Sequence, residues 1–198
     1  MGIELNYIEG QTPLDDDEKE GLINKAVATR QELDAFEQFN IQKAMLWLVG
    51  KKFTAKQILT EKFVMGLHKR MFGEVWRWAG TFRNTNKNIG IDKYLISLEL
   101  RVLLDDCNYW IDNQTFPPDE IAIRFKHRIV VIHCFANGNG RHSRLIADVI
   151  IEKLLGGEVF SWSGNNLISA GEARRFYLKA LRNADRNNFS DLIFFARS

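Results

Sequence analysis

The sequence predicts a mainly α-helical protein with one domain. Apolar residues recur at three- and four-residue spacing through most of the 198 residues, which is the periodicity of amphipathic helices, and only three prolines interrupt it. This length suits one domain with a hydrophobic core and is short for two. Residues 76–91 lack the helical period and combine glycines, asparagines and aromatic residues, so we expect a small β-hairpin or ordered loop near 79–92.

The first half of the chain predicts a short acidic helix and two longer helices. Residues 15–20 form an acidic run that can open a helix, because carboxylates favour the positive helix N-terminus. Thr29 is a suitable N-cap for a helix that reaches about Val49. Thr54 is a suitable N-cap for a second helix.

The second half predicts a pair of helices joined by a tight glycine turn. Prolines 117 and 118 are followed by two acidic residues. This pattern predicts that one helix ends before the prolines and that the next begins at them. That next helix breaks over 134–138, where Asn137-Gly138 favours a turn, and another begins near Asn139. The helices expected in this half cover about 97–113, 118–133, 139–155, 169–184 and a short stretch that ends near 195.

Composition and charge exclude several kinds of protein. The chain has 27 basic and 25 acidic side chains, which is not the basic excess of a dedicated nucleic-acid binder. Cys107 and Cys134 are too few for a cysteine-rich zinc site and are expected to be free thiols in a reducing compartment. No signal-peptide pattern and no apolar run of about 20 residues occurs, so we expect a cytoplasmic protein without membrane or nucleic-acid partners.

The clearest chemistry lies in the run His133-Cys-Phe-Ala-Asn-Gly-Asn-Gly-Arg-His-Ser-Arg144. Its glycines allow a ligand to approach the backbone, and the free N–H groups of the new helix favour an anion. Arg141 and Arg144 lie about one turn apart, so they can bind phosphate oxygens from one face. His133 precedes this turn and is placed to accept a proton. The residues therefore predict a phosphate site with an adjacent general base.

This run resembles the Fic-family motif His-x-Phe-x-(Asp/Glu)-Gly-Asn-Gly-Arg-x-x-Arg at eleven of its twelve positions, counting the unspecified ones. Residues 72–83 with 87–90, and residues 118–128, are similar to the family's flap region and to the helix that precedes its active loop. The resemblance implies a single-domain Fic fold, a helical bundle with a small β-hairpin flap near the active site. It also implies transfer of AMP from the donor ATP to a Ser, Thr or Tyr hydroxyl of a target protein.

The family's residue roles carry over by position. His133 is the expected general base. Backbone pairing with the flap is expected to hold the target segment. The phosphate-binding residues are expected to be Gly138, Asn139, Gly140, Arg141 and Arg144, and the flap residues Lys87, Asn88, Ile89 and Gly90.

One position departs from the motif. Asn137 stands where the family has Asp or Glu, the carboxylate that holds Mg²⁺. An amide oxygen can coordinate a hard cation but brings no charge, so we expect binding of Mg²⁺, or of Mn²⁺ in its place, to be weakened.

A second expectation concerns regulation. Many Fic proteins carry an inhibitory helix with Ser/Thr-x-x-x-Glu-Gly/Asn, and residues 16–21 come close, with Asp16 at the first position. The resemblance implies that Glu20 pairs with Arg144 and blocks the γ-phosphate site. We therefore divide the chain into an N-terminal segment, 1–28, hypothesised to be inhibitory, and a Fic domain, 29–198.

Three functions stay open at the level of sequence. The first is adenylyl transfer to a protein. The second is a related phosphotransferase, or a transferase that uses another nucleotide. The third is a weakly active nucleotide-binding or interaction module, for instance in a toxin–antitoxin pair, and Asn137 favours it. A homodimer and an antitoxin or regulator are further partner hypotheses, and the sequence does not identify the target.

Overall fold

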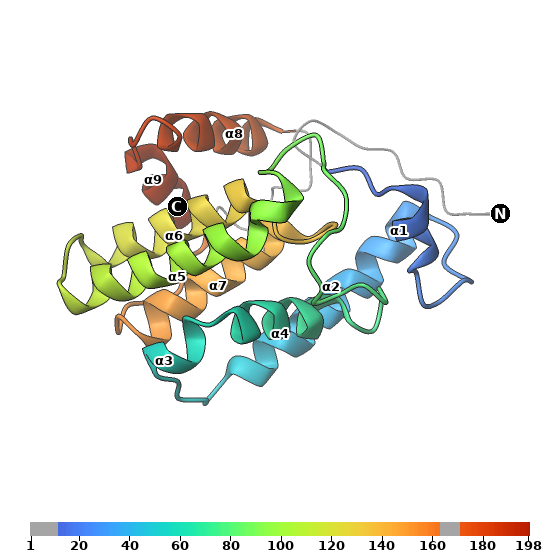
Figure 1. Ribbon diagram of the computed structural model, residues 1–198, viewed down its shortest axis with the longest axis horizontal. Coiled ribbons are helices and arrows are strands. Elements are labelled where there is room, and N and C mark those ends of the chain that lie inside the picture. Colours follow the sequence, from blue (N-terminus) through green and yellow to red (C-terminus); the bar gives the residue numbers. More distant parts are fainter. Residues whose placement is uncertain (1–11, 163–170) are drawn as a thin grey trace.

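The structure is a computed structural model that describes residues 12–162 and 171–198. It is mainly helical, as predicted (Figure 1). The helices are α1 (Asp16–Glu20), α2 (Arg30–Leu48), α3 (Ala55–Ile58), α4 (Glu61–Phe72), the 3₁₀ turn η1 (Lys93–Leu95), α5 (Ile96–Asp112), α6 (Pro118–Ile132), α7 (Asn139–Lys153), α8 (Glu172–Ala184) and α9 (Ser190–Arg197).

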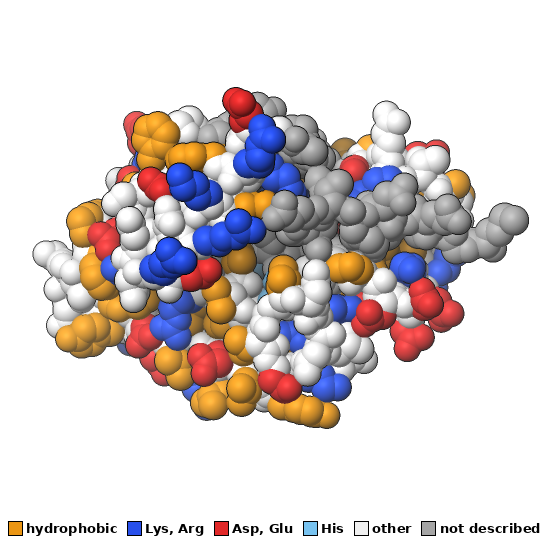
Figure 2. All heavy atoms as spheres, turned by 90° about the horizontal axis from the view of Figure 1, so that it is seen from above, with side chains coloured by type: hydrophobic (Ala, Val, Ile, Leu, Met, Phe, Trp, Pro, Cys, Tyr) orange, Lys and Arg blue, Asp and Glu red, His pale blue; other side chains and the backbone are white. Residues whose placement is uncertain are grey.

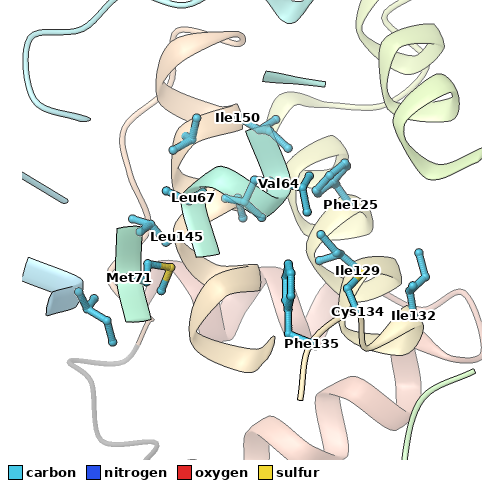
Figure 3. Packing of buried hydrophobic residues seen from close by; sticks show 14 of the residues in the cluster. Val64, Leu67, Met71, Phe125, Ile129, Ile132, Cys134, Phe135, Leu145 and Ile150 are labelled. Atoms are coloured by element: carbon cyan, nitrogen blue, oxygen red, sulfur yellow. The ribbon is translucent and has the colours of Figure 1, made fainter. Parts of the chain in front are cut away.

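Helices α6 and α7 pack against each other at the centre of the bundle (Figure 1). α4 covers α7 and is covered in turn by α2, while α5 and α9 pack on α6. The apolar faces of α4, α6 and α7 meet in one core, where Val64, Phe125 and Ile150 are fully buried (Figure 3). This core fixes the ends of α6 and α7, between which the motif loop, residues 133–140, runs.

Local capping explains where the early helices begin. The Thr29 hydroxyl accepts a hydrogen bond from the Glu32 N–H, and the Glu32 carboxylate accepts from the Thr29 N–H, which confirms the predicted start of α2. The single helix expected from Thr54 is instead two helices. Thr60 provides a second N-cap, accepting from the Phe63 N–H at 3.1 Å, so α4 starts anew after α3.

The expected β-hairpin is not formed. Residues 79–92, here called the flap segment, contain no strand, and among the described residues the only β-bridge is an isolated one between Leu22 and Trp76. The buried guanidinium of Arg83 donates to the carbonyls of Thr85 and Ile91 within the flap segment. A side chain therefore satisfies the carbonyl groups that a cross-strand ladder would have used.

The described part of the N-terminal segment, residues 12–28, packs on the rest of the molecule. The Ile23 N–H donates to the Val75 carbonyl and the Arg77 N–H donates to the Gly21 carbonyl, each at 2.9 Å. Leu14 and Leu22 are buried in the common core. The division at residue 28 stays a prediction, since residues on both sides of it share this core.

The surface carries both signs of charge. Figure 2 shows acidic, basic and apolar side chains interspersed, with a group of Lys and Arg side chains over one part of the face. Helix α8 carries four basic residues, Arg174, Arg175, Lys179 and Arg182. Within residues 12–162 and 171–198, no helix combines the length and apolar character that a membrane span requires.

Candidate functional site

His133 ends α6 in a left-handed backbone conformation, with φ 57° and ψ 59°. Its carbonyl accepts a hydrogen bond from Arg83 Nε at 2.6 Å, so Arg83 joins the flap segment to this helix end. The imidazole is buried, with 4% of the residue exposed. Nδ1 lies 3.4 Å from the Val130 carbonyl, and Nε2 lies 2.9 Å from the Thr12 hydroxyl.

The pKa of His133 is lowered to about 4, chiefly by burial; the hydrogen bond with the Val130 carbonyl opposes this shift, and the positive charges of Arg83 and Lys87 add to it. The imidazole is therefore neutral near pH 7. A carbonyl can only accept, so the Val130 contact assigns the ring hydrogen to Nδ1. Nε2 then carries a lone pair directed at a hydroxyl, which is the protonation state that a general base requires.

Asn139 holds the motif loop closed. Its Nδ2 donates to the Phe135 carbonyl at 2.7 Å, and its Oδ1 accepts from the Phe135 N–H at 2.9 Å. The Phe135 ring is fully buried and points into the apolar cluster (Figure 3). The buried Asn139 side chain is therefore engaged with the loop, and only its backbone N–H is left to serve the predicted phosphate site.

The N-terminus of α7 offers the backbone donors that the sequence predicts. Gly138 is the N-cap residue of α7, and no side chain caps this helix. The first intrahelical hydrogen bond of α7 runs from the His142 N–H to the Gly138 carbonyl. The N–H groups of Asn139, Gly140 and Arg141 thus lack intrahelical partners. Such a helix end favours an anion such as a phosphate.

Gly138 cannot be replaced by a larger residue at this turn. Its φ is 78°, and a Cβ built on it would lie 2.6 Å from the Phe72 ring. Its own N–H donates to Asn137 Oδ1 at 2.6 Å. The turn into α7 therefore needs glycine for both its backbone conformation and its packing.

The two motif arginines differ in their surroundings. Arg141 Nη1 donates to Glu37 Oε2 at 2.6 Å, and Glu37 also accepts from Trp76 Nε1 at 2.7 Å. Arg141 is thus oriented by a buried carboxylate of α2.

Arg144 has no hydrogen-bonded or ion-paired partner among the described residues. Burial lowers its pKa, Arg141 lowers it further, and Tyr177 and Asp148 oppose the shift. Within the described part of the chain, its guanidinium is thus the motif cation that is not paired with a carboxylate.

Asn137 does not by itself make a metal site. Its Oδ1 accepts from the Gly138 N–H, and its Nδ2 donates to the Thr12 carbonyl at 3.0 Å. No group of three or more His, Cys, Asp or Glu residues that could hold a metal occurs among the described residues. The residues present therefore do not fit a metal ion held by the protein alone.

The predicted flap residues are only partly at the site. A Cβ built on Gly90 would lie 2.6 Å from the His133 Cβ, so the backbone at Gly90 touches the base. Lys87 points to the N-terminal segment, where its buried Nζ pairs with Asp15 and Glu18. Asn88 and Ile89 are exposed.

The structure does not bring Glu20 and Arg144 together. Glu20 lies exposed at the end of α1, and its carbonyl accepts from Lys25. The buried glutamate of α1 is Glu18, two residues earlier. Since residues two apart point to nearly opposite sides of a helix, Glu18 and Glu20 cannot both face the flap segment.

Four further residues at the site escaped the sequence reasoning: Thr12, Glu37, His68 and Arg83. His68, fully buried in α4, lies 3.1 Å from the Asn137 carbonyl through Nε2 and accepts from the Gly80 N–H through Nδ1. Burial holds the pKa of His68 well below its usual value, and the ring stacks on Phe135. This histidine is a structural support of the motif loop, and its helical spacing alone gave no sign of that.

Comparison with known proteins points to one family. Residues 58–151 match the family model of the Fic/DOC family. The chain is 25% identical over 119 residues to "Protein adenylyltransferase Fic" of Aedes aegypti, covering 58% of the chain and 24% of that protein. It is 24% identical over 130 residues to the protein of the same name from Nematostella vectensis, covering 64% of the chain and 30% of that protein. The chain thus spans about a quarter of the length of these relatives.

Solved structures share the fold. BepC of Bartonella tribocorum, solved with bound AMPPNP, aligns with a TM-score of 0.66 at 14% identity over 92% of this chain and 97% of that one. Fic-1 (residues 134–508) of C. elegans aligns with a TM-score of 0.64 at 19% identity, over 90% of this chain and 51% of that one.

Proposed function

Because residues 58–151 match the model of the Fic/DOC family, we propose that the chain transfers AMP from ATP to a Ser, Thr or Tyr hydroxyl of a protein. The observation that carries the proposal is a neutral, buried His133 whose Nε2 faces a hydroxyl, at one end of a loop whose other end is the uncapped start of α7. A base and an anion site are the two parts that transfer of a phosphate-linked group needs. The names of the Aedes and Nematostella relatives support the reaction class.

Each motif residue has a role in the proposal. His133 Nε2 accepts the proton of the attacking hydroxyl. The N–H groups at the start of α7 bind the donor phosphates, and Arg144 adds a charge-assisted contact to them. Glu37 holds Arg141 in place, and Asn139 keeps the loop in shape for both ends of the site.

In this proposal the divalent metal ion binds together with the nucleotide donor, ATP. Mg²⁺, or Mn²⁺, would neutralise phosphate charge when bound with the nucleotide. On the protein side the motif contributes only the neutral amide of Asn137, whose oxygen already accepts from Gly138. We therefore propose that metal binding is weakened compared with a motif that carries Asp or Glu. The target protein, a homodimer, a regulator or antitoxin and a cytoplasmic location stay predictions from the sequence.

The test compares two labels of ATP. Native chain is incubated with α-labelled or γ-labelled ATP and Mg²⁺ or Mn²⁺, beside His133→Ala and a control, His127→Gln. His127 bonds Asp185, away from the motif loop. We expect protein-bound α-label with the native chain and the control, and none with His133→Ala.

The other functions predict different results. Protein-bound γ-label alone would support phosphotransfer. Absence of both labels from the native chain with both metals would contradict transfer and favour a nucleotide-binding module, which Asn137 favours already.

A further inference from the structure

We propose that Thr12 is an acceptor hydroxyl of this site, so that the chain adenylylates its own Thr12. The inference rests on the proposed function and adds the identity of one substrate. It comes from a single contact between residues 121 positions apart in sequence, in which Thr12 Oγ1 lies 2.9 Å from His133 Nε2. No part of the sequence motif involves residue 12.

The Thr12 hydroxyl is oriented as a substrate hydroxyl must be. With the His133 ring hydrogen on Nδ1 toward the Val130 carbonyl, Nε2 can only accept, so the Thr12 O–H is the donor in this contact. The proton that a transfer step must remove already points at the base. Thr12 is 6% exposed, so little bulk water competes with this contact.

The backbone of Thr12 is also held. Its carbonyl accepts from Asn137 Nδ2 at 3.0 Å, so the motif residue next to the anion site fixes the acceptor residue. Two residues further on, Leu14 is buried in the core. The hydroxyl therefore faces His133 because main chain and side chain are fixed together.

Ion pairs with the flap segment hold the chain beyond Leu14. Lys87, whose side chain is 3% exposed, pairs with Asp15 and with the buried Glu18. The Thr85 hydroxyl donates to Asp15 at 2.7 Å. The flap segment thus holds a piece of this chain through side chains, at the place where backbone pairing with a target was expected.

The reaction balances without a further reactant. Thr12 Oγ attacks the α-phosphorus of ATP while His133 Nε2 takes the hydroxyl proton. The bond between the α-phosphorus and the bridging oxygen breaks, and pyrophosphate leaves with that oxygen. His133 then gives up its proton to pyrophosphate or water, and Thr12 carries AMP as a phosphodiester.

The experiment is intact-mass measurement and peptide mapping of the full chain after incubation with ATP and Mg²⁺ or Mn²⁺. We expect the native chain to gain the mass of one adenylyl group on Thr12. Thr12→Ser keeps a hydroxyl and should keep the adduct, while Thr12→Val and His133→Ala should lose it. The control is Thr115→Val, which removes an exposed hydroxyl between α5 and α6 and should not change the adduct.

The outcomes separate this inference from the proposed function. If α-label appears on another residue or on an added protein while Thr12 stays unmodified, the inference is wrong and AMP transfer stands. If the native chain transfers no label to anything with both metals, both are wrong. If Thr12→Val gains as much adduct as the native chain, Thr12 is not the acceptor.

A mixing experiment tests whether the reaction occurs within one molecule. Native chain is incubated with an affinity-tagged His133→Ala chain, which has the acceptor and lacks the base. We expect label on the native chain alone, at a first-order rate independent of protein concentration. Equal labelling of the tagged chain would contradict modification in the docked position.

Discussion

Asn139 forms two hydrogen bonds with the backbone of Phe135, one to its carbonyl at 2.7 Å and one from its N–H at 2.9 Å. The pair joins the first helical residue of α7 to the middle of the motif loop. Because Phe135 is fully buried, neither of its backbone groups has water as a substitute. The Asn139 side chain is thus a structural element of the site.

Asn139→Ala is expected to destabilise the protein. It leaves two buried backbone groups without partners, each of which costs about 1–3 kcal/mol. The free energy of unfolding from urea titration measures the loss. The control Asn108→Ala removes an exposed bond to Asp112 and should change it by less than about 0.5 kcal/mol. An equal effect of both variants would contradict the role of Asn139.

Arg144→Lys is expected to weaken ATP binding. Lysine keeps the charge but cannot make the planar two-point contact of a guanidinium with phosphate. A hydrogen bond to a charged group contributes about 1.5–3 kcal/mol, so Kd for ATP should rise about tenfold or more. Calorimetric titration measures Kd, with Arg175→Lys on the exposed face of α8 as the matched control. Unchanged affinity would mean that Arg144 does not contact the donor.

Asn137→Asp is expected to have two opposite effects. A carboxylate attracts a divalent cation more strongly than an amide, so half-maximal transfer should need less Mg²⁺. The same change removes the donor to the Thr12 carbonyl, so the adduct on Thr12 should form more slowly than on the native chain at saturating Mg²⁺. Asn137→Ala separates the effects, because it loses the donor and gains no charge. An unaltered metal requirement in Asn137→Asp would show that this position does not face the metal.

Acid is expected to destabilise the fold. All four histidines, His68, His127, His133 and His142, have a lowered pKa, chiefly from burial, and His133 and His142 are lowered to about 4. Between pH 6.5 and 4 the unfolded chain therefore binds more histidine protons than the folded chain. The free energy of unfolding therefore decreases as the pH is lowered through this window, by about 1.4 kcal/mol per pH unit for each such proton.

One carboxyl group works against this trend. Burial raises the pKa of Asp148 to about 7, so the folded chain binds a proton there that the unfolded chain loses above its own pKa. Four histidines outweigh one aspartate, so urea midpoints should still be lower at pH 5 than at pH 7.5. His142→Gln should reduce the difference, and a midpoint that rises on acidification would contradict the assignment.

The sequence predicted what is local. The helix starts at Thr29 and at Pro118 follow from capping and proline rules that involve residues within one turn. The motif from His133 to Arg144 is contiguous, so its chemistry could be recognised before any fold was known.

What the sequence did not predict depends on contacts between distant residues. The bonds of Thr12 to His133 and of Glu37 to Arg141 join residues 121 and 104 positions apart. The flap segment was expected to be a hairpin because its composition suits one. Arg83, 50 residues from its partner His133, gives that segment another source of hydrogen bonds. No periodicity or spacing encodes such pairs, since they exist only once the helices have packed.

At position 133, the residue that best suits the left-handed backbone differs from the residue that the proposed reaction requires. A residue with a side chain is strained there by about 1 kcal/mol compared with glycine, which adopts the same φ freely. The backbone at the end of α6 alone would favour glycine, whereas the proposed reaction needs an imidazole. In a screen that scores folding alone, glycine should therefore be tolerated better at position 133 than alanine, and in a screen for transfer only histidine should survive.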